Sequence, residues 1–268
     1  LLNSLSRHLR PLIKIKQRPL SVHTVMSMRL VMIALLAAFG LTMRQSTARE
    51  QLADAVGMPL TTTVANGVRY QAGLWLAEQR ARVDTMKGEC DLIFIGDSIT
   101  YAWDGPLWQQ YYKPRRALNY GIPGDRVENV LYRLQYEGLQ HLRPKVAVVL
   151  IGTNNSGPAC ETAQGVQVVI NKTKNLFPGV KIILIDILPT ARRTEHITAT
   201  NKIIRNFADG QTVFRLNLAE RMTPEGDSWK GLKPDKLHLS SEGYAIWAEM
   251  MEPLLVELLE SYSLQSKL

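Results

Sequence analysis

A serine that directly follows an apolar run is the first residue in this sequence whose position suggests chemistry. The run Leu92–Ile95 ends in Gly96, Asp97 and Ser98. All three residue types favour turns, so turn formation alone would account for them. A serine hydroxyl becomes a nucleophile only when a base takes its proton and a third group orients that base. The interpretation of Ser98 therefore depends on a histidine and a carboxylate elsewhere in the chain.

His238 is the best candidate for that base. Asp235 stands three residues before it, so one turn of loop can place the carboxylate against one ring nitrogen while the other nitrogen faces Ser98. The other four histidines lie near the N-terminus, at the opposite end of the predicted sheet or beside a single glutamate: His8, His23, His141 and His196. The pattern predicts that Ser98, Asp235 and His238 act together, although Asp-x-x-His alone also occurs at ordinary helix entries.

Acyl transfer also needs hydrogen-bond donors for the negatively charged oxygen of the transition state. The backbone N–H groups of Ser98 and Gly124 and the side-chain amide of Asn154 are the candidates for this oxyanion hole. Gly124 suits the role because a residue without a β-carbon lets a substrate approach its N–H. The alternative for Gly124 and Asn154 is an ordinary place in a turn.

Alternating apolar and helical segments indicate how these residues are positioned. The apolar runs are Leu92–Ile95, Ala117–Tyr120, Val146–Ile151, Ile182–Ile187 and Val213–Leu218. The segments of helical composition are Pro106–Tyr112, Val127–Glu137, Glu161–Phe177, Glu195–Phe207 and Ser241–Leu259. Continuous β-branched runs that alternate with helices predict a parallel sheet covered on both faces. Ligands bind at the carboxyl ends of such strands, which is where the candidate residues follow.

Smaller features of the pattern lead to three further expectations. A helix is expected over Leu74–Lys87, after a loosely structured lead-in over Glu50–Gln71. Asp125 and Glu128 are interpreted as a capping pair that holds the N–H of Gly124 in place. The two cysteines lie at opposite ends of parallel strands, about 20 Å apart, whereas a disulfide needs α-carbons within about 7 Å. Two free thiols are therefore expected, at Cys90 and Cys160.

Four sequence blocks, taken in order, resemble the GDSL or SGNH hydrolase family. They are IFIGDSIT, LNYGIPGDRVENVLYRL, VLIGTNN and DKLHLSSEGY, and the similarity covers about Asp91–Leu254. Within the family they are similar to the catalytic subunits of platelet-activating factor acetylhydrolase type Ib and their bacterial relatives. One departure is Pro123, where close relatives carry glycine. Proline stiffens the loop and removes an N–H, so the pocket shape there is open, whereas the donor at Gly124 is kept.

This resemblance implies both a fold and a set of roles. The fold is α/β, a flavodoxin-like three-layer α/β/α sandwich with a five-stranded parallel sheet in the order 2-1-3-4-5. Ser98 is implied as the nucleophile and Asp235 and His238 as its triad partners. Ser98, Gly124 and Asn154 are implied as the oxyanion hole.

The excess positive charge lies in an N-terminal segment. Eight of the 32 basic residues precede Glu50, the first acidic residue, so the remaining 24 balance the 24 acidic ones. The net charge of +8 therefore predicts no nucleic-acid partner. No metal-spaced histidine or cysteine cluster and no phosphate-binding glycine loop occurs in the sequence, so no metal and no cofactor are predicted.

The N-terminal segment has the pattern of an export signal. Arg29 precedes the apolar stretch Leu30–Met43, which is too short to span a membrane comfortably. Small residues follow, which predicts cleavage after Ala48 and an exported protein without a stable membrane span. Residues 1–48 are thus expected to be a leader, 49–89 a lead-in with a helix, and 90–262 the hydrolase domain. Met26 or Met28 would be a natural start, so residues 1–25 are interpreted as an over-extended reading frame. The alternatives are an uncleaved anchor and an organellar presequence.

The sequence predicts a serine esterase that acts on small acyl esters, with acetyl groups on carbohydrates as the expected substrates. The alternatives are a lysophospholipase or thioesterase of the same fold, and an inactive carbohydrate-binding module. Two polar loops, Pro189–His196 and Met222–Pro234, flank the site and contain no long apolar lid, which disfavours long acyl chains. The roles of two pairs of residues stay open. Tyr101 and Trp103 either line the leaving-group side of the site or belong to the core. Arg192 and Arg193 either hold an anionic leaving group or are solvent-exposed loop residues. The oligomeric state is not predicted.

Overall fold

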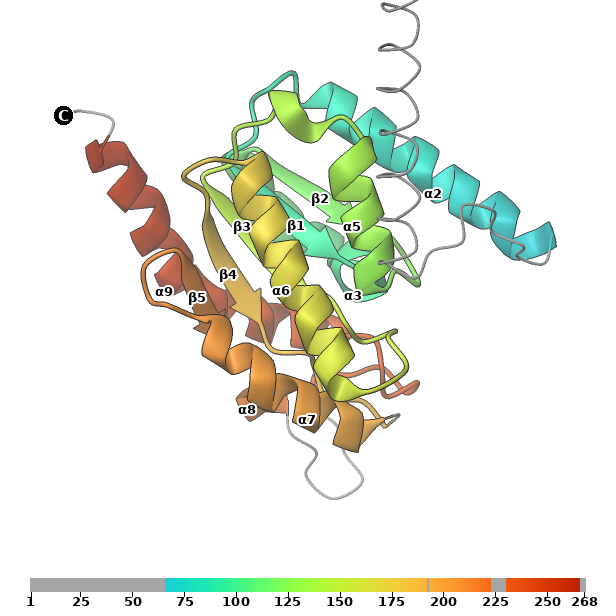
Figure 1. Ribbon diagram of the computed structural model, residues 1–268. Coiled ribbons are helices and arrows are strands. Elements are labelled where there is room, and N and C mark those ends of the chain that lie inside the picture. The colour runs from blue at the N-terminus through green and yellow to red at the C-terminus, as the bar shows by residue number, and fades with distance from the viewer. Residues whose placement is uncertain (1–65, 192, 223–229, 266–268) are drawn as a thin grey trace, which may run out of the picture. The chain divides into compact units, whose positions relative to one another are not determined.

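The computed structural model describes residues 66–191, 193–222 and 230–265, with side chains from residue 76 to residue 262. The leader and the cleavage position predicted at Ala48 lie outside these residues. Five strands form one parallel sheet in the order β2-β1-β3-β4-β5, which confirms the predicted sheet (Figure 1). The strands are β1 (Leu92–Gly96), β2 (Ala117–Gly121), β3 (Val146–Leu150), β4 (Lys181–Ile185) and β5 (Val213–Leu216).

Helices cover both faces of this sheet, as the predicted sandwich requires. The α-helices are α2 (Asn66–Thr85), α3 (Ser98–Tyr101), α4 (Gly105–Leu107), α5 (Val127–Tyr136), α6 (Ala159–Leu176), α7 (Thr194–Ile204), α8 (Ala219–Met222) and α9 (Ser241–Gln265). A π-helical turn, Trp108–Tyr112, continues α4, and the described residues also contain three 3₁₀ turns, Lys113–Arg115, Leu139–His141 and Arg205–Phe207. Helices α5, α6 and α7 pack on one face and α9 on the other, because each strand sends alternate apolar side chains to opposite faces (Figure 1).

The register of the sheet brings the loops that follow β1, β2 and β3 to one edge. Gly96 at the end of β1 pairs with Gly121 of β2 and with Leu150 of β3, so the three strands end level with one another. All the residues of β1 and β3 are buried, as expected for strands covered on both faces. The residues that follow these strands therefore lie near one another.

An aromatic cluster fills the core between the sheet and α9, and it decides the place of Trp103. The Trp103 ring lies 4.8 Å from the Trp247 ring and 4.9 Å from the Tyr112 and Tyr244 rings, and Trp103 is only 7% exposed. Trp103 is thus a core residue. Tyr101 is half-buried, and its hydroxyl hydrogen-bonds to the carboxylate of Glu78 at 3.1 Å.

Helix α2 begins earlier than the sequence indicates. It starts at Asn66, so the end of the lead-in expected over Glu50–Gln71 is helical. The prediction was wrong there because residues 66–73 carry no repeating apolar face that would reveal a helix. The helix is fastened to the sheet by Gln79, whose buried amide donates to the carbonyl of Gly121 at 2.6 Å. Within the described ranges, no helix combines the length and apolar composition that a membrane crossing requires.

Both cysteines are free thiols. Cys90 is buried, and its S–H donates to the carbonyl of Leu92 at 3.0 Å. Burial raises the pKa of this thiol to about 12, so it stays protonated at neutral pH. Cys160 is exposed at the beginning of α6.

Candidate active site

Ser98 occupies the first position of α3, directly after the end of β1. Asp97 caps this short helix, because its carboxylate accepts the N–H of Ile99 at 2.9 Å. Helix α3 lies against β2 so closely that a β-carbon at Gly121 would stand 2.3 Å from the nitrogen of Tyr101. A side chain at residue 121 would therefore push away the helix that carries Ser98, which explains the glycine there.

The structure brings Ser98 and His238 together across 140 residues of sequence. The Nε2 atom of His238 lies 3.0 Å from Oγ of Ser98, within hydrogen-bond distance. The Nδ1 atom lies 2.6 Å from Oδ2 of Asp235. With the ring proton on Nδ1, the imidazole donates to the carboxylate and can accept the hydroxyl proton of the serine. This is the arrangement in which a base is oriented and aimed at a nucleophile.

Asp235 and His238 belong to one short closed loop directly before α9. An antiparallel bridge between Leu232 and Leu239 closes the loop, and the N–H of Lys233 donates to the carbonyl of His238 at 2.7 Å. Oδ1 of Asp235 accepts the N–H groups of Leu237 and His238, both at 3.0 Å. Partial burial raises the pKa of Asp235, but hydrogen bonds from the ring and the N–H of His238 outweigh it and hold the value at about 2. The carboxylate is therefore ionised at neutral pH.

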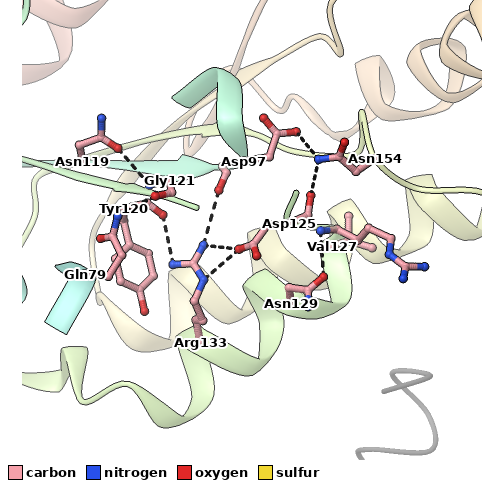
Figure 2. Close-up of polar contacts among 12 residues, drawn as sticks. Gln79, Asp97, Asn119, Tyr120, Gly121, Asp125, Val127, Asn129, Arg133 and Asn154 are labelled. Atoms are coloured by element: carbon pink, nitrogen blue, oxygen red, sulfur yellow. Dashed lines mark hydrogen bonds and ion pairs between the residues drawn. The ribbon is translucent and has the colours of Figure 1, made fainter. Parts of the chain in front are cut away.

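Gly124 and Asn154 also lie at this edge of the sheet. Gly124 is exposed and has a φ of +80°, a left-handed conformation that favours glycine. No described residue accepts its N–H. The Asn154 amide nitrogen donates to the carbonyl of Asp125 at 2.9 Å and lies 3.4 Å from Oδ2 of Asp97 (Figure 2). Its second hydrogen therefore has only a distant acceptor, so it remains available to a bound ligand.

The predicted capping pair is wrong. The carboxylate of Asp125 does not cap α5 but accepts two hydrogen bonds from Arg133, at 2.9 and 2.6 Å. The N–H of Val127 donates instead to the side chain of Asn155 at 3.1 Å, and the same amide donates to the carboxylate of Glu128 at 3.2 Å. A buried guanidinium offers Asp125 a stronger partner than a backbone N–H, because both groups are charged.

Two buried carboxyl groups lie beneath the edge. Burial raises the pKa of Asp97, which is 0% exposed, to about 7, and the nearby charge of Asp125 acts in the same direction. Burial also raises the pKa of Asp125 to about 6, although the guanidinium of Arg133 opposes the shift. Carboxyl groups removed from water favour the neutral form. At neutral pH this edge of the sheet therefore carries less negative charge than two fully ionised aspartates would give it.

Other candidate residues lie outside this arrangement. His196 is on α7, where Nε2 contacts the hydroxyl of Thr162 at 3.3 Å, and His141 is exposed at the other end of the sheet. Arg193 donates to the carbonyl oxygens of Asn154, at 3.4 Å, and of the next residue, so it braces their loop. Arg192 lies outside the described residues. No group of three His, Cys, Asp or Glu side chains in the described ranges could hold a metal ion.

Sequence reasoning missed Arg133 and Asn155. Arg133 is 2% exposed on the face of α5 that also carries Val130 and Leu134, so its signal was a charged residue on an apolar stripe. Asn155 stood beside a stronger candidate, Asn154, in the same turn.

A cavity of about 310 Å³ lies along the edge strand β2, away from this site. Arg82 and Trp108 line it, whereas Ser98, Asp235 and His238 do not.

Comparisons with known proteins place these features in a family context. Residues 94–246 match the model of the GDSL-like lipase/acylhydrolase family. The chain is 30% identical over 196 residues to the platelet-activating factor acetylhydrolase IB subunit alpha1 of Pongo abelii, over 70% of this chain and 85% of the relative.

Two solved structures share the fold. A GDSL-like lipase from Bacteroides thetaiotaomicron superposes with a TM-score of 0.59 at 20% identity, over 68% of this chain and 97% of that one. A carbohydrate esterase of family 3 from Talaromyces cellulolyticus gives a TM-score of 0.52 at 19% identity, over 64% and 99%.

Proposed function

The chain belongs to the GDSL-like lipase/acylhydrolase family, and we propose that it is a serine esterase that removes small acyl groups, chiefly acetyl, from carbohydrate alcohols. Membership of the family makes it an ester hydrolase. The observation that carries the proposed serine mechanism is the 3.0 Å contact between His238 and Ser98, with the Asp235 carboxylate 2.6 Å from the other ring nitrogen.

The proposed reaction forms an acyl-enzyme. Oγ of Ser98 attacks the ester carbonyl carbon while Nε2 of His238 takes the hydroxyl proton. The tetrahedral intermediate collapses, and His238 returns that proton to the departing alcohol. Water then attacks the acyl group, again losing a proton to His238, and the second collapse restores the Ser98 hydroxyl and releases the carboxylic acid. Asp235 keeps its negative charge throughout and stabilises the imidazolium.

Three donors surround the position where the oxyanion forms in this proposal. They are the N–H groups of Ser98 and Gly124 and the Asn154 amide hydrogen whose acceptor, Oδ2 of Asp97, is 3.4 Å away. The N–H of Ser98 is the first of α3, so no acceptor within the helix competes for it. Each such donor contributes roughly 3 kcal/mol to the stabilisation of a transition state.

The choice of a small acyl group and a carbohydrate alcohol rests on a structural neighbour and on the composition of two sequence segments. The neighbour from Talaromyces cellulolyticus is a carbohydrate esterase. The segments 189–196 and 222–234, which the sequence leads us to expect at the site, are polar in composition. Polar loops suit a hydroxyl-rich alcohol better than a long hydrocarbon chain.

A panel of esters tests the proposal. The panel contains p-nitrophenyl esters of increasing chain length, acetylated oligosaccharides, a lysophospholipid and an acyl thioester, and Ser98→Ala is the blank. We expect labelling by a fluorophosphonate probe, the highest kcat/KM at the acetyl ester and release of acetate from the oligosaccharides. Preference for the lysophospholipid or thioester would reject the substrate assignment but not the mechanism. Absence of both labelling and hydrolysis would reject the mechanism and leave a binding module.

We also propose that the protein is exported after cleavage near Ala48. Support comes from the apolar stretch Leu30–Met43 and the small residues that follow it. N-terminal sequencing of the protein recovered outside the cytoplasm should begin near Arg49. Recovery of an intact leader in a membrane fraction would show that the stretch is retained as an anchor.

A further inference from the structure

We propose that Arg133 is a positioning residue that sets the geometry of the oxyanion hole without touching the substrate. Its guanidinium contacts the ends of β1 and β2, which lead into two segments of the hole, and reaches the third segment through the Asp125 carbonyl that accepts from Asn154 (Figure 2). The inference rests on the proposed esterase function and deepens it, since it names a residue on which the rate of that reaction depends.

The contacts of Arg133 reach both strand ends. One terminal nitrogen donates to the carbonyl of Tyr120 at 3.1 Å, and the other lies 3.5 Å from the carbonyl of Gly96. The Nε atom and this second terminal nitrogen donate to Oδ2 of Asp125 at 2.9 and 2.6 Å. The flat fork of a guanidinium can serve several acceptors at once, which a lysine ammonium cannot do with the same geometry.

Two of these acceptors, Gly96 and Asp125, stand within two residues of a donor of the proposed hole. Gly96 stands two residues before Ser98, and Asp125 directly follows Gly124. The carbonyl of Asp125 in turn accepts one hydrogen of the Asn154 amide at 2.9 Å, so it sets where the other hydrogen points. Displacement of Asp125 would therefore move two of the three donors together.

The burial of this ion pair supports a specific role. Arg133 is 2% exposed and Asp125 is 7% exposed, and the guanidinium also lies over the Tyr120 ring at 4.2 Å from its centre. A buried ion pair adds little net stability compared with apolar residues of similar size. Arg133 lies on the apolar face of α5 and Asp125 in the turn that precedes this helix, so a fixed set of hydrogen bonds determines the position of that turn.

Arg133→Lys tests the inference in the full-length protein. The variant keeps the charge but loses the fork, and a shift of about 1 Å in a reacting group costs about 100-fold in rate. We expect kcat for an acetyl ester to fall by about 100-fold while KM changes little. Affinity for a trifluoromethyl ketone, which forms a tetrahedral adduct with a catalytic serine, should fall by the same factor. A merely structural role would not change kcat and adduct affinity in parallel.

Arg115→Lys is the matched control. Arg115 makes a two-pronged ion pair with Glu252 before the start of β2, at the opposite end of that strand. The same substitution there should leave kcat and adduct affinity unchanged. A double-mutant cycle with Asn154→Ala adds a second comparison, because Arg133→Lys should cost less than 100-fold once the Asn154 amide is gone and fewer donors remain to be displaced.

Arg133→Gln combined with Asp125→Asn provides a second variant if Arg133→Lys does not fold, because two amides replace the ions without leaving a lone buried charge. It should show the same loss of kcat. The inference is wrong if a folded variant keeps kcat within about threefold of wild type, if the losses multiply fully with Asn154→Ala, or if neither variant folds. The proposed function fails separately, if wild type is no more active than Ser98→Ala.

Discussion

Replacement of Asp97 by asparagine should change how the stability of the protein depends on pH. Asp97 is fully buried, and its pKa rises from 3.8 to about 7 on folding. Between these two values the folded protein keeps a proton that the unfolded chain has lost. The free energy of unfolding therefore falls as pH rises through this range. An amide cannot ionise, yet its oxygen can still accept the N–H of Ile99, so Asp97→Asn should lack this part of the pH dependence.

The size of the effect follows from the two pKa values. The contribution of Asp97 to the unfolding free energy decreases by about 3 kcal/mol between pH 5 and pH 8, at 1.4 kcal/mol for each unit over which only the unfolded chain is ionised. Asp125 also titrates in this range, but it is present in both proteins and largely cancels from their difference. From pH 5 to pH 8, the free energy of unfolding of Asp97→Asn should therefore rise by about 3 kcal/mol relative to that of wild type.

Urea unfolding followed by circular dichroism at pH 5, 6, 7 and 8 measures the difference. Asp209→Asn is the control, because three backbone N–H groups lower the pKa of exposed Asp209 to about 2, well below this range. Its unfolding free energy should run parallel to that of wild type from pH 5 to pH 8. A parallel result for Asp97→Asn as well would show that Asp97 ionises normally and would refute the reasoning.

The remaining predictions concern the proposed triad. Ser98→Ala should keep the melting temperature but lose hydrolysis to below about a hundredth of the wild-type rate, measured with p-nitrophenyl acetate. His238→Ala should lose about as much, and the double variant no more, because the two residues act as one unit. Asp235→Asn should lower kcat strongly but leave it above that of Ser98→Ala, since nucleophile, base and oxyanion donors remain. His196→Ala should leave the rate unchanged, because its ring contacts Thr162 rather than Ser98. A loss as large as that of His238→Ala would move the role of base to His196.

The amino-acid sequence was informative where a residue type and its place along the chain are enough. The buried strands can be recognised in the sequence as β-branched runs, and Ser98 and His238 stand after such runs. The order of the strands came from family resemblance, because apolar runs do not show which strand pairs with which. The direction of a carboxylate is likewise not local: Asp125 stood in a capping position, but its partner Arg133 is fixed by the packing of α5 on the sheet. Buried ion pairs of this kind need the fold before they can be recognised.

The short loop that holds Asp235 and His238 has a consequence for folding. These two side chains are three residues apart and can meet through local motion alone. Their meeting with Ser98 closes a loop of 140 residues, at an entropic cost of about 4 kcal/mol. The same closure brings the hydroxyl of Tyr244 on α9 to the carbonyl of Ile99 at 2.7 Å. Contacts of such long range form slowly, so the recovery of activity during refolding would report the docking of the C-terminal helix rather than the assembly of the sheet.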